Sequence, residues 1–305
     1  MLSLLLGLAA KTFFGFWLAL EVNILIFTGI LRINTKLSVS TLIYFIPQSL
    51  TSATLLFLVF LRTHTQLRLV SLCLIPAAIF MKLGLAPLHI WFIQISPLLR
   101  RYIFFMISTT QKILPLFLAA FLAKKRLPFF LAVSVLVARI SALAHKRIPL
   151  ILAFSSIFSG CWILASAKIT HGLAYFWLYT ISLAIFLLRA TSPKVETLGD
   201  IWSLPWVKRA SLMVAIFALI GIPPTAIFIG KLFVLLDLIT TKNWMLAASL
   251  LITSFIFFWA YARILFSQAA LRQKRLRLIV STSPEFWGVR LARASLIRAP
   301  WILLI

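Results

Sequence analysis

The stretch MKLGLAPLHIWF, residues 81–92, places a lysine inside an apolar run, five positions before a proline and seven before a histidine. Proline interrupts a helix because it lacks a backbone N–H donor and its ring clashes with the preceding turn. What a charged residue beside such a break can do depends on whether the run lies in water or in lipid. The composition of the whole chain answers that question.

The composition is that of a membrane protein. Of 305 residues, 63% are hydrophobic and 11% are charged, and the mean hydropathy is +1.09. A soluble domain is about half apolar and a quarter charged. Apolar runs of about 20 residues, long enough to cross a hydrocarbon core about 30 Å thick, recur along the chain. We therefore expect an all-α polytopic membrane protein. The nine expected spans are residues 13–31, 40–61, 68–97, 102–123, 127–145, 148–168, 173–190, 209–239 and 243–266.

Both ends of the chain raise the expected number of transmembrane helices to about 10–11. Residues 1–10 are expected to form a truncated additional helix. Residues 285–305 are interrupted by three arginines, so they either cross the membrane against protein neighbours or lie in its interface.

The formal net charge is +25, from 30 Lys and Arg against five acids. Most cations lie between the spans, where anionic lipids such as cardiolipin and the positive-inside rule explain them. The loop after the first full span lies on the side with more cations, so it is expected to face the cytoplasm-equivalent compartment. No basic helix with interleaved aromatics indicates nucleic-acid binding. Cys73 and Cys161 lie in apolar runs without Cys-x-x-Cys spacing, which argues against a disulfide framework or a zinc site.

Four charged residues lie near the middle of separate spans: Glu21, Lys82, Lys112 and Lys231. One such charge costs roughly 2.5–3.5 kcal/mol at a helix centre, so four would cost about 10 kcal/mol. Removal from water disfavours the charged form of lysine and carboxylate alike, so both can exchange protons, whereas arginine cannot. The pattern indicates a proton relay in which a Glu21–Lys82 pair forms and breaks. A structural Glu–Lys pair and snorkelling lysines are the alternatives.

His89 belongs to the same region because imidazole carries protons near neutral pH. It either relays protons or only forms a hydrogen bond at the helix break. The remaining histidines, His64, His145 and His171, lie at span ends and indicate no site.

Two of the expected spans, the third and the eighth, contain a helix break beside a lysine. Paired interrupted spans at corresponding positions indicate inverted repeats with the functional site at the breaks. We expect a single transmembrane domain over 1–305. Its parts are a first repeat at 1–123 with an incomplete N-terminal helix, a second repeat at 124–266, and a basic linker with a C-terminal helix at 267–305. The residues of the breaks are Gly84 and Pro87 near Lys82, and Gly221, Pro223 and Pro224 before Lys231.

These motifs resemble those of a known family. KLGLAPLHIWF (82–92) is similar to the signature of the subunit 2 family of mitochondrial NADH:ubiquinone oxidoreductase (respiratory complex I), which belongs to the antiporter-like subunits. The resemblance extends over about residues 14–266. The other matching stretches, in order, are WLALEVNILIF (17–27), QKILP (111–115), ILAFSSIFSGCW (151–162) and GIPPTAIFIGK (221–231).

The resemblance implies two inverted five-helix repeats, each with a discontinuous helix, and one proton channel along a polar axis. In that channel Glu21 and Lys82 would be the switching pair, Lys112 the bridge, and Lys231 the lysine nearest one end. It implies a multi-pass subunit of the mitochondrial inner membrane that translocates protons while other subunits reduce quinone. The partners would be other membrane-arm subunits. With no GxGxxG motif and no cysteine cluster, the chain itself is expected to bind no cofactor and to carry no redox site.

The sequence departs from the family pattern in several places, of which two affect the predicted function and partners. Ser159 stands where the family has a histidine, so any relay there must use water or another group. Few residues precede the match, so a separate chain is expected to supply missing N-terminal helices. Two other functions remain open, a stand-alone cation/proton antiporter and a structural spacer of the membrane arm that no longer pumps.

Overall fold

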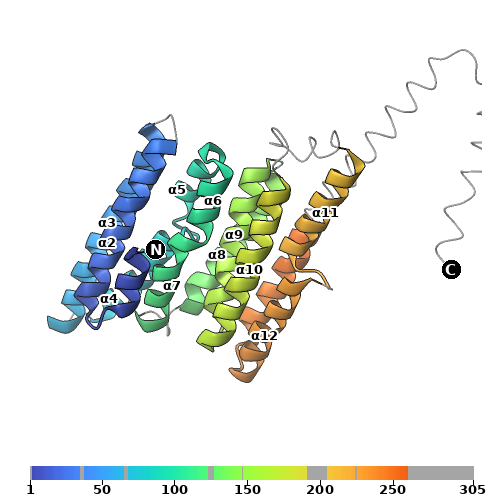
Figure 1. Ribbon diagram of the computed structural model, residues 1–305. Helices are drawn as coiled ribbons and strands as arrows, with labels where there is room; N and C mark the ends of the chain where they lie inside the picture. Colours follow the sequence, from blue (N-terminus) through green and yellow to red (C-terminus); the bar gives the residue numbers. More distant parts are fainter. Residues whose placement is uncertain are drawn as a thin grey trace, which may run out of the picture. The chain divides into compact units, whose positions relative to one another are not determined.

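The described part of the computed structural model consists of helices (Figure 1). The structure describes residues 2–34, 38–64, 68–122, 127–145, 147–190, 205–223 and 225–259. These all belong to one unit, Met1–Ala260, and the expected C-terminal helix lies outside the described residues. The helices are α1 (Leu2–Ala9), α2 (Phe13–Asn34), α3 (Ser38–His64), α4 (Arg68–Leu83), α5 (Ile90–Ile95), the 3-10 helix η1 (Ser96–Leu98), α6 (Arg101–Ser108), α7 (Thr110–Leu122), α8 (Leu127–Ala144), α9 (Ile148–Ala165), α10 (Ile169–Arg189), α11 (Trp206–Ile220), α12 (Ala226–Thr240) and an unlabelled helix at Trp244–Trp259.

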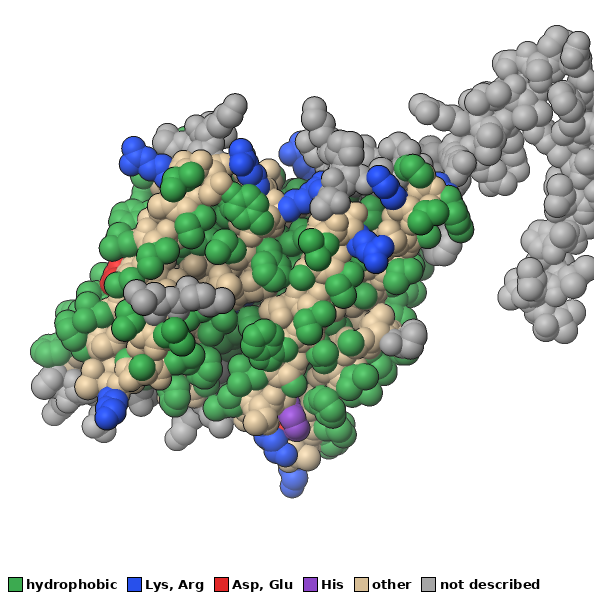
Figure 2. Space-filling view, viewed as in Figure 1, with side chains coloured by type: hydrophobic (Ala, Val, Ile, Leu, Met, Phe, Trp, Pro, Cys, Tyr) green, Lys and Arg blue, Asp and Glu red, His purple; other side chains and the backbone are tan. Residues whose placement is uncertain are grey.

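Several of the described helices are long and apolar enough to cross a membrane, which confirms a multi-pass membrane protein. Figure 2 shows hydrophobic side chains over the middle of the helices and Lys and Arg side chains toward their two ends. The two runs of about 30 residues, expected at 68–97 and 209–239, are each divided into shorter helices. The five candidate spans are Phe13–Asn34, Val39–Leu61, Arg101–Leu122, Ile148–Ala165 and Ile169–Arg189.

Both expected breaks begin in the same way. α4 ends at Leu83 and the next residue, Gly84, has φ +66°; α11 ends at Ile220 and Gly221 has φ +75°. A residue with a Cβ pays a steric cost in this left-handed region, so glycine is the usual residue just past a helix end. A glycine after each first half-helix therefore defines the corresponding point of the two broken spans.

A third interruption, at Thr109, divides the expected span 102–123 into α6 and α7. Three successive hydroxyls donate hydrogen bonds back to carbonyls four residues earlier: Ser108 to Phe104, Thr109 to Phe105 and Thr110 to Met106. Such bonds bend helices, and Pro115 removes a further backbone donor one turn later. This break lies three residues before Lys112.

Helix α9 lies in the middle of the unit and packs against α5, α7, α8, α10 and α12. Most of its side chains are buried. It approaches the first break closely, because a Cβ on Gly160 would lie 2.9 Å from Cδ2 of Leu85. One helix therefore contacts the neighbourhoods of all three breaks.

Candidate functional site

At the first break, each of three successive helix-end backbone carbonyls accepts a hydrogen bond from a different group. The Leu85 N–H donates to the Phe80 carbonyl (2.8 Å), and Nε1 of Trp91 donates to the Met81 carbonyl (2.9 Å). The Lys82 carbonyl accepts a hydrogen bond from Nε2 of Gln48 (3.2 Å) on α3. Backbone carbonyls that lose their helical donors inside a membrane require other hydrogen-bond partners. Because such partners are present here, the fold stabilises the break.

Lys82 is 4% exposed, and its Nζ donates to the backbone carbonyl of Gln48 (3.2 Å). Glu21 accepts a short hydrogen bond from the hydroxyl of Ser52, four residues after Gln48 on α3. Residues four apart share a helix face. No ion pair joins Glu21 to Lys82, both of which the structure describes. The two charged groups are thus connected through one turn of α3, and a direct switching pair stays a prediction.

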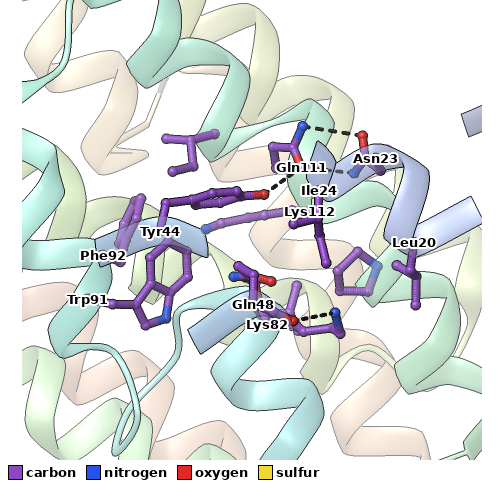
Figure 3. Close-up of a pocket in the computed structure, with 13 residues that line it drawn as sticks. Leu20, Asn23, Ile24, Tyr44, Gln48, Lys82, Trp91, Phe92, Gln111 and Lys112 are labelled. Carbon is purple, nitrogen blue, oxygen red and sulfur yellow. Dashed lines mark hydrogen bonds between the residues drawn. The ribbon is translucent and has the colours of Figure 1, made fainter. Parts of the chain in front are cut away.

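Lys82 and Lys112 line one small cavity of about 10 Å³, room for about one water molecule (Figure 3). A polar cluster forms part of its wall: the amide of Asn23 donates to Oε1 of Gln111 (2.8 Å), which also accepts from the hydroxyl of Tyr44 (3.1 Å). The cavity therefore joins two lysines that lie 30 residues apart in the sequence.

Lys112, also 4% exposed, reaches from α7 to α9. Its Nζ donates to the hydroxyl of Ser156 (2.6 Å) and to the Ser156 carbonyl (2.8 Å). The ammonium group also lies 5.6 Å from the centroid of the Phe92 ring, within the range of a cation–π interaction. Lys112 thus connects the cavity to the central helix.

Lys231 is 7% exposed and binds the second break. Its Nζ donates to the carbonyl of Ile220 (2.6 Å), which the end of α11 leaves without a helical donor. The rings of Phe158 and Trp162 from α9 lie 5.8 and 5.6 Å from the ammonium group. Lys112 therefore contacts α9 at Ser156, and Lys231 contacts it two and six residues later, at Phe158 and Trp162.

The other predicted site residues surround these three lysines less closely. Nδ1 of His89 lies 3.2 Å from the Pro87 carbonyl, and His89 makes no side-chain capping bond at the start of α5. Within the described part of the chain His89 forms no hydrogen bond to Lys82 or Lys112, so its relay role stays a prediction. Pro223 lies in the turn after α11, and Pro224 lies outside the described residues.

The Ser159 hydroxyl donates to the Ser156 carbonyl (2.9 Å). Nearby polar groups lack partners. Among the buried side-chain atoms that the structure describes, Nε1 of Trp162, the hydroxyl of Tyr179 and that of Thr225 have no hydrogen bond. Buried polar groups without a protein partner commonly bind water. These three atoms therefore add polar groups to the region between Ser156 and Lys231.

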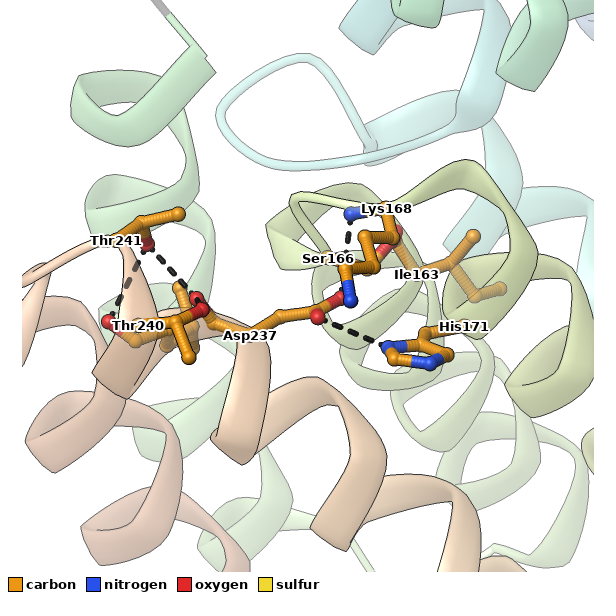
Figure 4. Close-up of polar contacts among 8 residues, drawn as sticks. Ile163, Ser166, Lys168, His171, Asp237, Thr240 and Thr241 are labelled. Atoms are coloured by element: carbon orange, nitrogen blue, oxygen red, sulfur yellow. Dashed lines mark hydrogen bonds and ion pairs between the residues drawn. The ribbon is translucent and has the colours of Figure 1, made fainter.

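Two sets of residues were missed from sequence. Gln48, Ser52 and Ser156 are neutral residues of ordinary helices, and only packing shows that they hold the charged groups. The second set is an ion pair between Asp237 on α12 and His171 on α10 (2.9 Å) (Figure 4). Asp237 lies six residues after Lys231 in the same apolar run, so its position offered a signal.

No family model matches the chain. A curated relative does: NADH-ubiquinone oxidoreductase chain 2 of Rhipicephalus sanguineus is 30% identical over 269 residues, which is 87% of this chain and 85% of the relative. The chain belongs to the NADH-ubiquinone oxidoreductase chain 2 family. This membership confirms the resemblance found in the motifs.

Solved structures share the fold of this chain. Respiratory complex I from Thermus thermophilus contains a chain with TM-score 0.70 and 20% identity, covering 88% of this chain and 74% of that one. The Mrp complex from Dietzia sp. DQ12-45-1b contains one with TM-score 0.74 and 19% identity. That match covers 86% of this chain, which spans 57% of the Mrp chain. These likenesses confirm the predicted all-helical, antiporter-like membrane fold.

Proposed function

We propose that this chain is a proton-translocating subunit in the membrane arm of NADH:ubiquinone oxidoreductase, in the mitochondrial inner membrane. Its partners are the other membrane-arm subunits, with anionic lipid at the cationic loops. Electron transfer takes place in other subunits, since the chain offers two cysteines without Cys-x-x-Cys spacing and no GxGxxG motif. Family membership supports the assembly, and the buried lysines support the proton transfer.

The proposed proton-transfer role is supported chiefly by the burial and the hydrogen bonds of the three lysines. Each has 7% exposure or less, and each Nζ donates to carbonyl or hydroxyl oxygens. A neutral oxygen stabilises an ammonium group less than a carboxylate does, so these lysines can give up and regain a proton. Arginine in the same places could not.

The contacts support one order of the groups along the proposed path. Glu21 connects to Lys82 through Ser52 and Gln48, and the cavity joins Lys82 to Lys112. Ser156 and the unpartnered polar atoms of α9 and α10 continue toward Lys231. Water completes the gaps, as in other intramembrane proton pathways built from titratable side chains.

The repeats at 1–123 and 124–266 are part of the same proposal. What supports them is the left-handed glycine after α4 and after α11, and a buried lysine near each break whose Nζ donates to a backbone carbonyl, of Gln48 on α3 and of Ile220 at the end of α11. Interrupted helices at corresponding positions are typical of inverted-repeat transporters.

The test replaces Lys82, Lys112 and Lys231 singly by methionine in the assembled complex, with Lys208→Met at the exposed start of α11 as the matched control. Methionine keeps the length and flexibility of the side chain and removes the charge. We expect each interior variant to lower the number of protons moved per electron, measured in sealed membrane vesicles, and Lys208→Met to leave it unchanged. Wild-type stoichiometry in all three interior variants would contradict the proton-transfer role and favour a structural spacer.

A second candidate, a stand-alone cation/proton antiporter, is favoured by the structural similarity to the Mrp complex. Native gel electrophoresis of mild-detergent extracts distinguishes the two. A complex I subunit migrates with NADH dehydrogenase activity, whereas a free antiporter migrates apart from it.

A further inference from the structure

Asp237 and His171 form a buried carboxylate–imidazole pair at the end of α12 that lies farther from the second break (Figure 4). Asp237 is in the last turn of α12, and His171 is in the first turn of α10. Oδ1 of Asp237 lies 2.9 Å from Nδ1 of His171, and Oδ2 accepts a hydrogen bond from the Lys168 backbone N–H (3.2 Å). Both carboxylate oxygens are thus bound by α10.

The two members of the pair differ in their access to water. The Asp237 side chain is 3% exposed and that of His171 is 31% exposed. Phe233 stacks on the imidazole, with ring centroids 5.4 Å apart. The imidazole therefore separates the carboxylate from the water, with one face covered by an aromatic ring.

The charged groups around the pair are few. Lys168 precedes α10 and Lys242 follows α12, and both are exposed. The hydroxyls of Thr240 and Thr241 donate their hydrogen bonds to the backbone carbonyl of Asp237 and not to its carboxylate. Asp237 is one of five acids in the whole chain.

A purely structural role explains the pair poorly. An asparagine could accept the Lys168 N–H bond and donate to His171, and would join α12 to α10 without burying a charge. A buried carboxylate carries a desolvation cost that an amide avoids. The acid is the residue of choice where the group must gain and lose a proton.

The packing of α10 on α12 connects the pair to Lys231. Asp237 lies six residues after Lys231, about 9 Å along the helix. Lys231 lies beside the ring of Trp162, which stacks on Tyr175, one turn from His171 on α10. The unpartnered Nε1 of Trp162 offers a donor for water on this route.

We propose that Asp237 and His171 form the site where protons pass between Lys231 and the water at this end of α12. The inference rests on the proposed function and adds the group at which the path meets the aqueous phase. In one direction, the Lys231 ammonium releases a proton through water to the Asp237 carboxylate, which becomes a neutral acid. Neutral His171 in its Nε2–H form then takes this proton from Asp237 at Nδ1, and the imidazolium releases the Nε2 proton to the solvent. The ring is left in its Nδ1–H form, and proton exchange with water must restore the Nε2–H form before the next transfer. Each step moves one proton, and the reverse order carries a proton inward.

Asp237→Asn is the decisive variant, since asparagine preserves both hydrogen bonds to α10 and cannot carry a proton. We expect its proton-to-electron ratio to fall as far as that of Lys231→Met, at a level of assembled complex equal to the wild type on native gels. Asp237→Glu is expected to recover part of the loss. Thr240→Val, in the same turn of α12, is the control and is expected to pump normally.

His171→Ala provides a second, chemical readout. Its pumping is expected to rise with added imidazole and to stay low in a non-titrating buffer of equal ionic strength, because free imidazole can take the vacant place at the exposed side. A merely structural pair would show no such dependence. Should Asp237→Asn fail to assemble, His171→Ala decides the question by itself.

The outcomes distinguish this inference from the proposed function. If Lys231→Met lowers pumping while Asp237→Asn and His171→Ala pump like the wild type, the exchange site is refuted and the path through the lysines stands. If Lys231→Met alone has no effect on pumping, the exchange site is refuted; if Lys82→Met, Lys112→Met and Lys231→Met all pump like the wild type, the proposed function fails and the exchange site fails with it.

Discussion

The three buried lysines differ in the oxygen that holds each ammonium group. Lys82 and Lys231 donate to backbone carbonyls, of Gln48 and Ile220, which no side-chain substitution can remove. Lys112 alone among them donates to a hydroxyl, that of Ser156. A hydroxyl can accept a proton at its oxygen while it donates its own. Ser156 is therefore the partner whose removal tests proton transfer most directly.

Ser156→Ala should slow proton pumping while the complex stays assembled. Lys112 keeps the Ser156 carbonyl, and the lost hydrogen bond is worth only about 0.6 kcal/mol in a membrane protein. Ser155→Ala is the matched control, because the Ser155 hydroxyl binds only the Leu152 carbonyl of its own helix. Initial pumping rates in vesicles compare the two. Equal rates in the two variants would show that the hydroxyl plays no part in the transfer.

At this scale the sequence predicted the charged residues and missed their partners. Glu21, Lys82, Lys112 and Lys231 are visible in a sequence because a charge inside an apolar run is costly. Gln48, Ser52 and Ser156 are ordinary helix residues, and which helices adjoin decides their role. From the sequence, His171 was interpreted as a span-end residue that indicates no site. The structure places it beside Asp237, 66 residues away, and only this contact indicates a role for it.

At the scale of elements, each buried lysine lies near an interruption in a helix. Lys82 precedes the first break by two residues, Lys112 follows the bend at Thr109, and Lys231 follows the second break. The glycine and proline breaks were predicted from sequence, because those residue types interrupt helices by themselves. The bend at Thr109 was missed because its cause is a set of three hydroxyl–carbonyl bonds, from residue types that are also common in straight helices.

Gly221→Ala tests whether the second break must keep its shape. The substitution forces alanine to φ +75° and places Cβ 2.8 Å from Ile227 and 3.1 Å from Nζ of Lys231. The left-handed conformation alone costs about 1–2 kcal/mol. We expect a lower melting temperature of the assembled complex, measured by heating before native electrophoresis, together with weaker pumping.

The control for this variant is Gly29→Ala in α2, where a new Cβ meets no atom within 4 Å. Alanine in an open helical position is neutral or stabilising by about 0.5–1 kcal/mol. If Gly221→Ala proves as stable as Gly29→Ala, the left-handed glycine is not required at the break.

At the scale of the whole unit, the cations divide between the two ends of the helices. The lengths of the apolar runs predicted nearly every helix, since each run must match the membrane. Which helices adjoin each other could not be predicted from the sequence, because an apolar helix has no polar face to indicate its orientation. The central position of α9 is the main example. Successive helices place Arg32, Arg100, Arg147, Arg189 and Lys208 at one end, and Lys11, Lys168 and Lys242 at the other.

Thiol labelling checks the predicted orientation. We expect a membrane-impermeant maleimide to react with Lys208→Cys from the matrix side and with Lys242→Cys from the opposite side, because the end with more cations stays in the matrix. Both positions are exposed, and the native Cys161 is buried. Labelling of the two variants from the same side, or in the reversed order, would contradict this orientation.

The size and lining of the cavity between Lys82 and Lys112 lead us to expect that it excludes metal ions. Its volume of about 10 Å³ suits one water molecule and leaves no room for a hydrated sodium ion. Its lining contains two ammonium groups and no acid, so a metal cation would meet repulsion where it needs oxygen ligands. Protons avoid this barrier because they pass from group to group without occupying the cavity as an ion. If the proposed function is correct, we expect the subunit to be a barrier to sodium and potassium while it conducts protons.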